Sequence, residues 1–199
     1  MWGDVLAHVL RHAEISFAAL TLACALGVPL GVAAAQERLA HGPILGAAAI
    51  GRTLPSLALL TLMLPWLGVG LLPAVVALAL LALPPIVVNA DLAIAGVPFA
   101  ALDAATGLGM TPAQRFTRVS VPLALPVAIA GIRTAAVEVI GSATLATFIG
   151  AGGLGDDIVR ALQTSDMTLL LISALAVALM AFFAEFILAR LAKVLEFAR

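Results

Sequence analysis

Long apolar runs separated by short polar segments dominate the hydrophobicity pattern of this 199-residue chain. Five of the runs are close to the roughly 20 residues that an α-helix needs to cross a bilayer. They cover approximately residues 14–35, 44–66, 71–90, 121–148 and 168–189. The connections are short, and neither a polar linker nor a convincing internal repeat divides the chain. We therefore expect an all-α integral membrane protein, with one transmembrane domain over residues 1–199 and about five spanning helices.

The longest interruption that carries polar residues begins at Asp103 and separates the third run from the fourth. Gly109 can adopt the left-handed conformation that ends a short helix. Thr111 follows as an N-cap, with Pro112 at the first helical position and Gln114 where a capping box places Glu or Gln. The pattern predicts two short helices joined at a glycine, which we call the elbow.

The composition agrees with a membrane protein, because 63% of the residues are hydrophobic and only 11% are charged. A soluble domain carries about 25% charged residues. The first apolar run is long for a signal peptide, and Asp4 and Glu14 stand where a basic cluster would be, so we expect this run to be retained. The net charge of −1 gives no indication of nucleic-acid binding.

Lysine and arginine residues are distributed unevenly between the two ends of the predicted spans. One side holds Arg38, Arg115, Arg118, Arg190, Lys193 and Arg199, whereas the other holds Arg11 and Arg160. Basic residues are enriched on the cytoplasmic side of membrane proteins. We therefore expect the elbow and the C-terminus in the cytoplasm and the N-terminus outside.

Four charged residues fall inside the predicted spans, namely Arg52, Arg133, Glu138 and Glu185. Charges at this depth face protein or a water-filled path. They either line a translocation pathway or pair with one another to fix helix packing, for instance Arg133 with Glu185 or Arg52 with Glu138. The sequence favours neither interpretation.

Residues typical of catalysis or metal binding do not form a recognised motif. His8 and His12 are four apart, but no third ligand accompanies them, so a position on the juxtamembrane surface is the better interpretation. We expect no catalytic site, no metal and no cofactor bound by this chain. The chain also has no tyrosine and two tryptophans, Trp2 and Trp66, which cannot form an aromatic cage for a quaternary ammonium group without another subunit.

A glycine-rich segment, with Gly150, Gly152, Gly153 and Gly155, precedes the last predicted span. A nucleotide-binding loop would need a preceding strand and usually a following Lys-Ser/Thr, and neither is present. We expect a tight turn or a re-entrant segment on the outer side, with Asp156 or Asp157 starting a short outer helix.

The elbow resembles the EAA loop of ABC importer permeases. That loop has the pattern Glu-Ala-Ala, three residues, Gly, nine residues, Ile-x-Leu-Pro. Asp103-Ala104-Ala105, Gly109 and Val119-x-Val121-Pro122 match its spacing, with conservative changes of Glu to Asp and of Ile and Leu to Val. In the family this loop forms the coupling helices that dock in a groove of the cytoplasmic ATPase. The resemblance implies that residues 97–122 are an ATPase-coupling loop that includes Asp103, Ala104, Ala105, Gly109, Thr111, Pro112 and Arg115.

Three further stretches are similar to the permeases for osmoprotectants (glycine betaine, choline and carnitine), whose transmembrane domain is MetI-like. They are residues 53–60 (TLPSLALL), 131–135 and 143–155, so the resemblance extends over nearly the whole chain. Arg52 is a departure, because a neutral polar residue, often Gln, is expected there. The candidate pathway or gate residues are Arg52, Thr53, Pro55, Ser56, Arg133 and Glu138.

The resemblance implies a transport subunit in a bacterial cytoplasmic membrane, surrounded by lipid. Two permeases, identical or related, would pack together on a cytoplasmic ATPase dimer that binds ATP and Mg. A periplasmic or lipid-anchored binding protein would deliver the solute to the outer face. This chain would convert closure of the ATPases into alternating access without chemistry of its own.

Two other transport functions and one enzyme class remain as alternatives. The same kind of machine can carry methionine or another amino-acid-like solute, because the GAGGLG segment is shared with methionine-type importers. A stand-alone secondary carrier would need inverted repeats and its own substrate-binding groups, and neither is visible. A membrane enzyme such as a lipid transferase would need clustered acidic residues, whereas Asp91 and Asp103 stand far apart.

Overall fold

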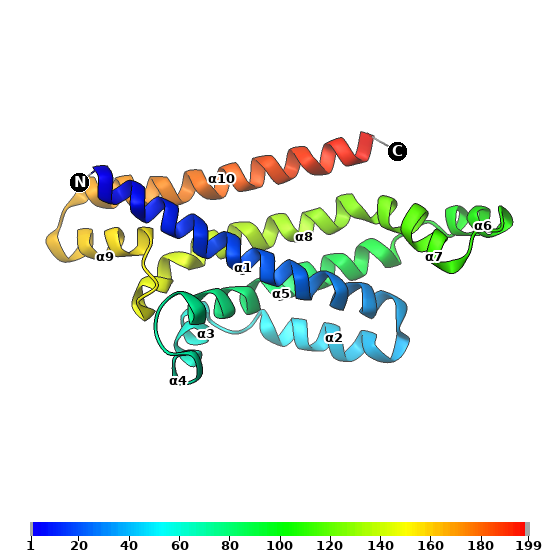
Figure 1. The fold of residues 1–199 in the computed structure, drawn as a ribbon, viewed down its shortest axis with the longest axis horizontal. Coiled ribbons are helices and arrows are strands. Elements are labelled where there is room, and N and C mark those ends of the chain that lie inside the picture. Colours follow the sequence, from blue (N-terminus) through cyan, green and yellow to red (C-terminus); the bar gives the residue numbers. More distant parts are fainter. Residues whose placement is uncertain (1, 198–199) are drawn as a thin grey trace.

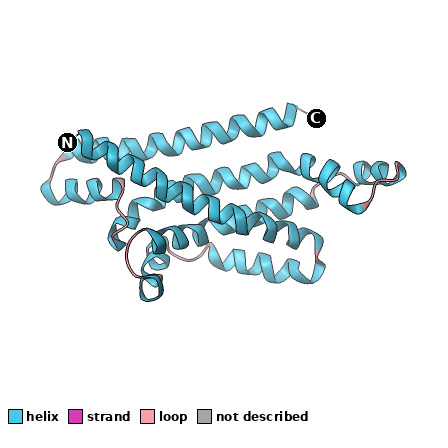
Figure 2. Ribbon diagram, in the orientation of Figure 1, coloured by secondary structure: helices cyan, strands magenta, loops and turns pink. Residues whose placement is uncertain are grey.

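The computed structural model of the chain describes residues 2–197 and is helical nearly throughout (Figures 1 and 2). The first half contains α1 (Trp2–Gln36), α2 (Arg38–Gly51), α3 (Ser56–Leu62), α4 (Leu64–Leu67) and α5 (Leu71–Ala95). The elbow follows as α6 (Phe99–Gly107) and α7 (Pro112–Arg115). The second half contains a π-helical segment (Phe116–Ser120), α8 (Val121–Ser142), a 3₁₀ segment (Ala143–Ile149), α9 (Leu154–Thr164) and α10 (Met167–Phe197).

Four helical stretches of the described residues are long and apolar enough to cross a membrane. They are Val5–Gln36, Leu71–Ala95, Pro112–Ile149 and Met167–Glu196. The run expected at 44–66 does not form one straight helix, because α2 and the α3–α4 segment meet at a bend of 100°. Pro55 disfavours the helical conformation at Leu54 and cannot donate a helical hydrogen bond. The described residues therefore contain four candidate spans, or five if the bent pair counts as one.

Helix α5 lies at the centre of the molecule, with α1 and α8 packed against it. A Cβ atom added at Gly31 would lie 2.5 Å from the carbonyl oxygen of Val87 and 2.5 Å from the Cβ of Ala90. On α8, a Cβ atom at Gly131 would lie 2.7 Å from the carbonyl oxygen of Pro85. Both approaches are closer than any other residue allows, so the glycines let these helices touch α5 at backbone distance.

The two ends of the molecule carry different elements (Figure 1). The N-terminal end of α1 lies beside α9 at one end, which we call the α9 end. The elbow projects at the opposite end, the elbow end, and α10 runs towards it. Large apolar side chains are exposed along α10, including Leu171, Leu175, Phe182 and Ile187. Such a surface needs lipid or another membrane subunit against it.

We expect Gly31→Ala to destabilise the protein and Gly46→Ala to leave its stability unchanged or slightly higher. Both substitutions gain up to about 1 kcal/mol of helix propensity, and nothing lies within 4 Å of a Cβ atom at Gly46. The clash at Gly31 with the backbone of α5 should cost about 1–3 kcal/mol. Thermal unfolding of the purified protein in detergent measures both, and equal unfolding temperatures would contradict this account of the α1–α5 contact.

Candidate functional site

The end of α6 has the geometry that the sequence predicts for the first arm of the elbow. Gly109 has a φ of +77°, which confirms the expected left-handed conformation. The backbone N–H of Met110 donates to the carbonyl oxygen of Ala105 at 3.1 Å, the six-to-one bond of a Schellman motif. The glycine therefore ends α6 and redirects the chain towards α7.

The start of α7 carries the expected capping box. The Thr111 hydroxyl accepts a hydrogen bond from the Gln114 backbone N–H, and the Thr111 backbone N–H donates to the Gln114 side chain at 2.9 Å. Sequence reasoning missed one further contact, in which Arg115 Nη1 donates to Thr106 Oγ1 at 2.8 Å. This bond joins the two arms, so local contacts fix the angle of the elbow.

The surface of the elbow combines apolar and charged side chains. Asp103, Ala104, Thr111 and Pro112 are exposed, whereas Ala105 is buried at the base of α6. The side chains of Phe99 and Leu108 are 80% and 78% exposed, respectively. Because large apolar groups at a polar rim are typical of protein–protein contacts, this surface can dock a protein partner.

The break between α2 and α3 places several predicted pathway residues on the surface. Arg52, Thr53 and Pro55 are exposed, and Ser56 is half-buried. The Thr53 hydroxyl donates to the carbonyl oxygen of Ile50 at 2.7 Å, which satisfies an acceptor at the end of α2. The break therefore presents a charged and a polar side chain at a site that lies within the apolar run.

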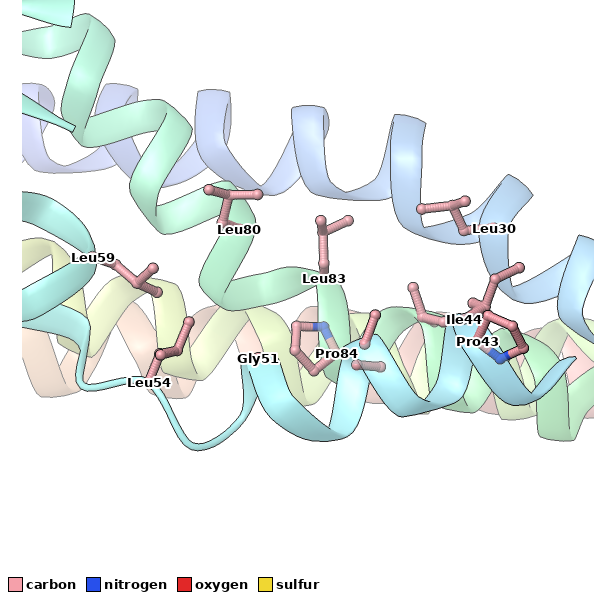
Figure 3. A pocket seen from close by; sticks show the side chains of 12 residues that line it. Leu30, Pro43, Ile44, Gly51, Leu54, Leu59, Leu80, Leu83 and Pro84 are labelled. Carbon is pink, nitrogen blue, oxygen red and sulfur yellow. The ribbon is translucent and has the colours of Figure 1, made fainter. Parts of the chain in front are cut away.

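A hollow of about 420 Å³ lies beside this break, between α1, α2 and α5 (Figure 3). Its lining is apolar and includes Leu30, Pro43, Leu54, Leu83 and Pro84. None of the predicted pathway residues lines it. The hollow therefore offers no charged group to a solute, and the candidate polar residues lie outside it.

The intramembrane charges divide into an ion pair and two exposed groups. Arg133 Nε donates to Glu185 Oε1 at 3.1 Å, and Nη2 contacts the same oxygen, so α8 and α10 are joined as one of the two predicted pairings requires. Arg52 and Glu138 form no ion pair with each other, and both side chains are exposed. The structure thus pairs Arg133 with Glu185, whereas Arg52 acts on Glu138 through space without an ion pair within 4 Å.

The glycine-rich segment forms a tight loop that leads into α9. Gly150, Gly152 and Gly153 have φ values of +73°, +83° and +95°. A Cβ atom at Gly155 would lie 2.1 Å from the carbonyl oxygen of Thr144, so α9 begins in direct contact with the 3₁₀ segment. The expected short helix is present as α9, but its N-cap is Gly153, and the two aspartates lie in its first turn.

The expected surface position of both N-terminal histidines is wrong for His12, which is completely buried. Its Nε2 donates to the carbonyl oxygen of Ile140 at 2.9 Å. His8 lies nearby, with Nδ1 2.8 Å from Asp157 Oδ2. The reason is that α8 and the glycine-rich loop pack over His12, while α9 lies against α1 at His8, and these contacts join residues far apart in the sequence. Within residues 2–197, no three His, Cys, Asp or Glu side chains form a group that could hold a metal ion.

Comparison with known proteins identifies a transport family. A family model described as "Binding-protein-dependent transport system inner membrane component" matches residues 27–198. The choline transport system permease protein OpuBB of Bacillus subtilis is 42% identical, over 94% of this chain and 86% of its own length. The osmoprotectant import permease protein OsmW of Salmonella typhimurium is also 42% identical, over 93% and 88% of the two chains. An inward-facing structure of the MetNI methionine ABC transporter shares the fold, with a TM-score of 0.86 at 22% identity, and the match covers 98% of this chain and 97% of that one.

We expect Arg133→Leu and Glu185→Leu each to lower the unfolding temperature by several degrees, and the double variant to recover most of the loss. Either single change leaves one charge unpaired among spanning helices, which costs on the order of 1–3 kcal/mol. The double change removes both charges and keeps the volume apolar. Thermal unfolding in detergent checks this, and losses that simply add in the double variant would show that the pair does not stabilise the α8–α10 contact.

Proposed function

The chain belongs to the family of inner membrane components of binding-protein-dependent transport systems, and from this we propose that it is the permease of an ATP-driven importer of quaternary-amine osmoprotectants. The solutes are small compounds such as glycine betaine, choline or carnitine. The projecting elbow is the observation that supports coupling of this chain to an ATPase. The solute class rests on relatives that are named for transport of these compounds.

The elbow, residues 97–122, is the joint to a cytoplasmic ATPase dimer. Its angle is fixed by Gly109, by the Thr111 capping box and by the Arg115–Thr106 bond, so a push on the exposed arm moves a rigid lever. Asp103 and Ala104 on α6 and Pro112 at the start of α7 form part of the docking surface, and buried Ala105 supports it. ATP and Mg bind to the partner subunits, and this chain carries out no hydrolysis.

The elbow end and the C-terminus lie in the cytoplasm, and the N-terminus and the α9 end lie outside. This orientation is supported by the basic residues near the elbow end, including Arg38, Arg118 and Arg190. Lysine and arginine in short loops favour the cytoplasmic side. A binding protein, either soluble or tethered, then meets the glycine-rich loop and α9 from outside.

The translocation pathway runs along the surface that exposes Arg52, Thr53 and Glu138, where Pro55 and Ser56 shape the break in the helix. Exposed charges in a spanning segment are unfavourable against lipid. A second permease copy, identical or related, covers this surface and leaves a polar path between the two chains. Residues 1–199 act in this assembly as a single transmembrane domain.

An importer of methionine or a similar amino acid is the second candidate. The solved methionine importers share the fold of this chain at 22% identity, which supports the architecture and not the solute. Relatives named for choline, glycine betaine or carnitine transport are 36–42% identical to this chain. The osmoprotectant proposal is therefore the stronger of the two.

We expect the wild-type chain to co-purify with an ATPase encoded beside it, and Gly109→Val to lose most of this partner while it still inserts into the membrane. Valine at a φ of +77° strains the backbone by about 1–3 kcal/mol, although no atom lies within 4 Å of the new Cβ. Gly107→Val is the matched control, because its surroundings are equally open and its φ is not positive. If the Gly109→Val variant retained the ATPase, the proposal that the elbow couples the two subunits would be wrong.

We expect proteoliposomes that contain the complete importer to take up labelled glycine betaine, choline or carnitine in an ATP-dependent manner. Methionine should not compete at a hundredfold excess over the labelled solute, about 2.7 kcal/mol of discrimination. Uptake of methionine alone would establish the second candidate. Solute uptake by the permease without its ATPase would instead establish a secondary carrier.

A further inference from the structure

Four charged or titratable side chains lie between α1 and α9, away from the elbow and the pathway surface. Asp157 is the centre of this group and is completely buried. Its Oδ2 lies 2.8 Å from His8 Nδ1 on α1, and its Oδ1 accepts a hydrogen bond from Arg160 one turn later on α9. A buried carboxylate needs such partners, because the loss of either leaves charge without compensation.

The second connection runs from α1 to the glycine-rich loop itself. Arg11 Nε donates to the carbonyl oxygen of Ala151 at 2.9 Å, while Arg11 Nη1 is held by Glu14 at 2.7 Å. One position further along α1, a Cβ atom at Gly153 would lie only 3.3 Å from His12 Nδ1. The loop therefore rests directly on α1, and its glycines allow the close approach.

The far side of the same loop is attached to the other helices. The backbone N–H of Gly70, just before α5, donates to the carbonyl oxygen of Ile149 at 2.8 Å. Thr147 donates to the side chain of Asp156, which ties the 3₁₀ segment to α9. Asp166 Oδ1 accepts from the Leu169 backbone N–H at 3.0 Å and so caps α10. The loop and α9 are thus attached to α1, to the start of α5 and to the 3₁₀ segment that follows α8.

We propose that His8, Arg11, Asp157 and Arg160 form a latch that holds α1, the glycine-rich loop and α9 together as one body while the pathway switches. Separation of α9 from α1 would expose a buried carboxylate and break hydrogen bonds to charged groups, each of which is stronger than a neutral one. The long-range ion pair near the elbow end, between His41 and Asp91 at 3.3 Å, joins α2 to α5 and does not tie the elbow to the bundle, so the conformational change is concentrated in the elbow and between permease copies. The part that concerns switching rests on the proposed importer function.

The test is hydrogen–deuterium exchange of the backbone amides of residues 150–164 in the assembled complex. We expect exchange in His8→Ala to be at least about tenfold faster than in the wild type, because α9 loses a charge-assisted bond to α1. His8→Asn places an amide donor near the position of Nδ1 and should restore slow exchange. His41→Ala is the matched control, since it removes a histidine beside Asp91 near the opposite end and should leave residues 150–164 unchanged.

The wild-type complex should show the same slow exchange at 150–164 in its resting state and when trapped with ATP and vanadate. Faster exchange in the trapped state would mean that the latch opens during the cycle and would overturn the proposal. An exchange rate at 150–164 in His8→Ala equal to that of the wild type would also overturn the proposal. This comparison can be made on the chain alone. Failure of the importer assignment would be seen separately, as the absence of an ATPase in the co-purification.

Discussion

The backbone-distance contact of α1 and α8 with α5 is the constraint on which the rest of the structure depends. Lipid provides no hydrophobic force between spanning helices, so their association relies on close packing and on polar contacts. Gly31 and Gly131 allow that packing on two sides of α5, where any larger residue would collide with backbone or Cβ atoms. The ion pair of Arg133 and Glu185 then attaches α10 to α8. The bundle is therefore assembled outward from α5.

The same central position explains why the proline-rich helix α5 can remain regular. Pro84 and Pro85 each remove a backbone donor, and the carbonyl oxygens that they leave free must be covered in a membrane. The freed oxygens are those of Leu80 and Leu81, one turn earlier. The prolines themselves are enclosed, since a Cβ atom at Gly51 would lie 3.2 Å from Pro84 Cγ and the Asn89 side chain donates to the carbonyl oxygen of Pro85 at 2.8 Å. In the second apolar run, Pro55 has no enclosing helices, and there the chain breaks and bends. Pro29 and Pro43 are exposed and also lie inside continuous helices, so enclosure accounts for the regular course of α5 and does not by itself determine where a proline ends a helix.

The elbow could be predicted almost completely from the sequence, whereas the α9 end could not. The left-handed Gly109 and the Thr111–Gln114 box depend on residues within a few positions of one another, so local conformational preferences determine them. The contacts of His8 with Asp157 and of His12 with Ile140 join residues 149 and 128 positions apart. Nothing in the neighbourhood of a histidine shows that a distant helix will cover it. The pairing of Arg133 with Glu185 lies between these cases. Only four charged residues fall inside the predicted spans, so few opposite-charge pairs were possible.

This division between local and long-range contacts also gives the two ends different mechanical properties. The elbow is held in shape by its own short-range bonds and contacts the bundle through the π-helical segment at 116–120 and through Leu102, which packs against a small cluster that contains Ala93 and Ala124. It can move as a lever without loss of its internal geometry, and π-helical turns are frequent where a helix must adjust. The α9 end depends instead on long-range contacts. Its loop has little regular structure of its own and is held by side chains of α1 and by the backbone just before α5. A displacement of the elbow would therefore reach the α9 end as movement of whole helices, as the proposed coupling function requires.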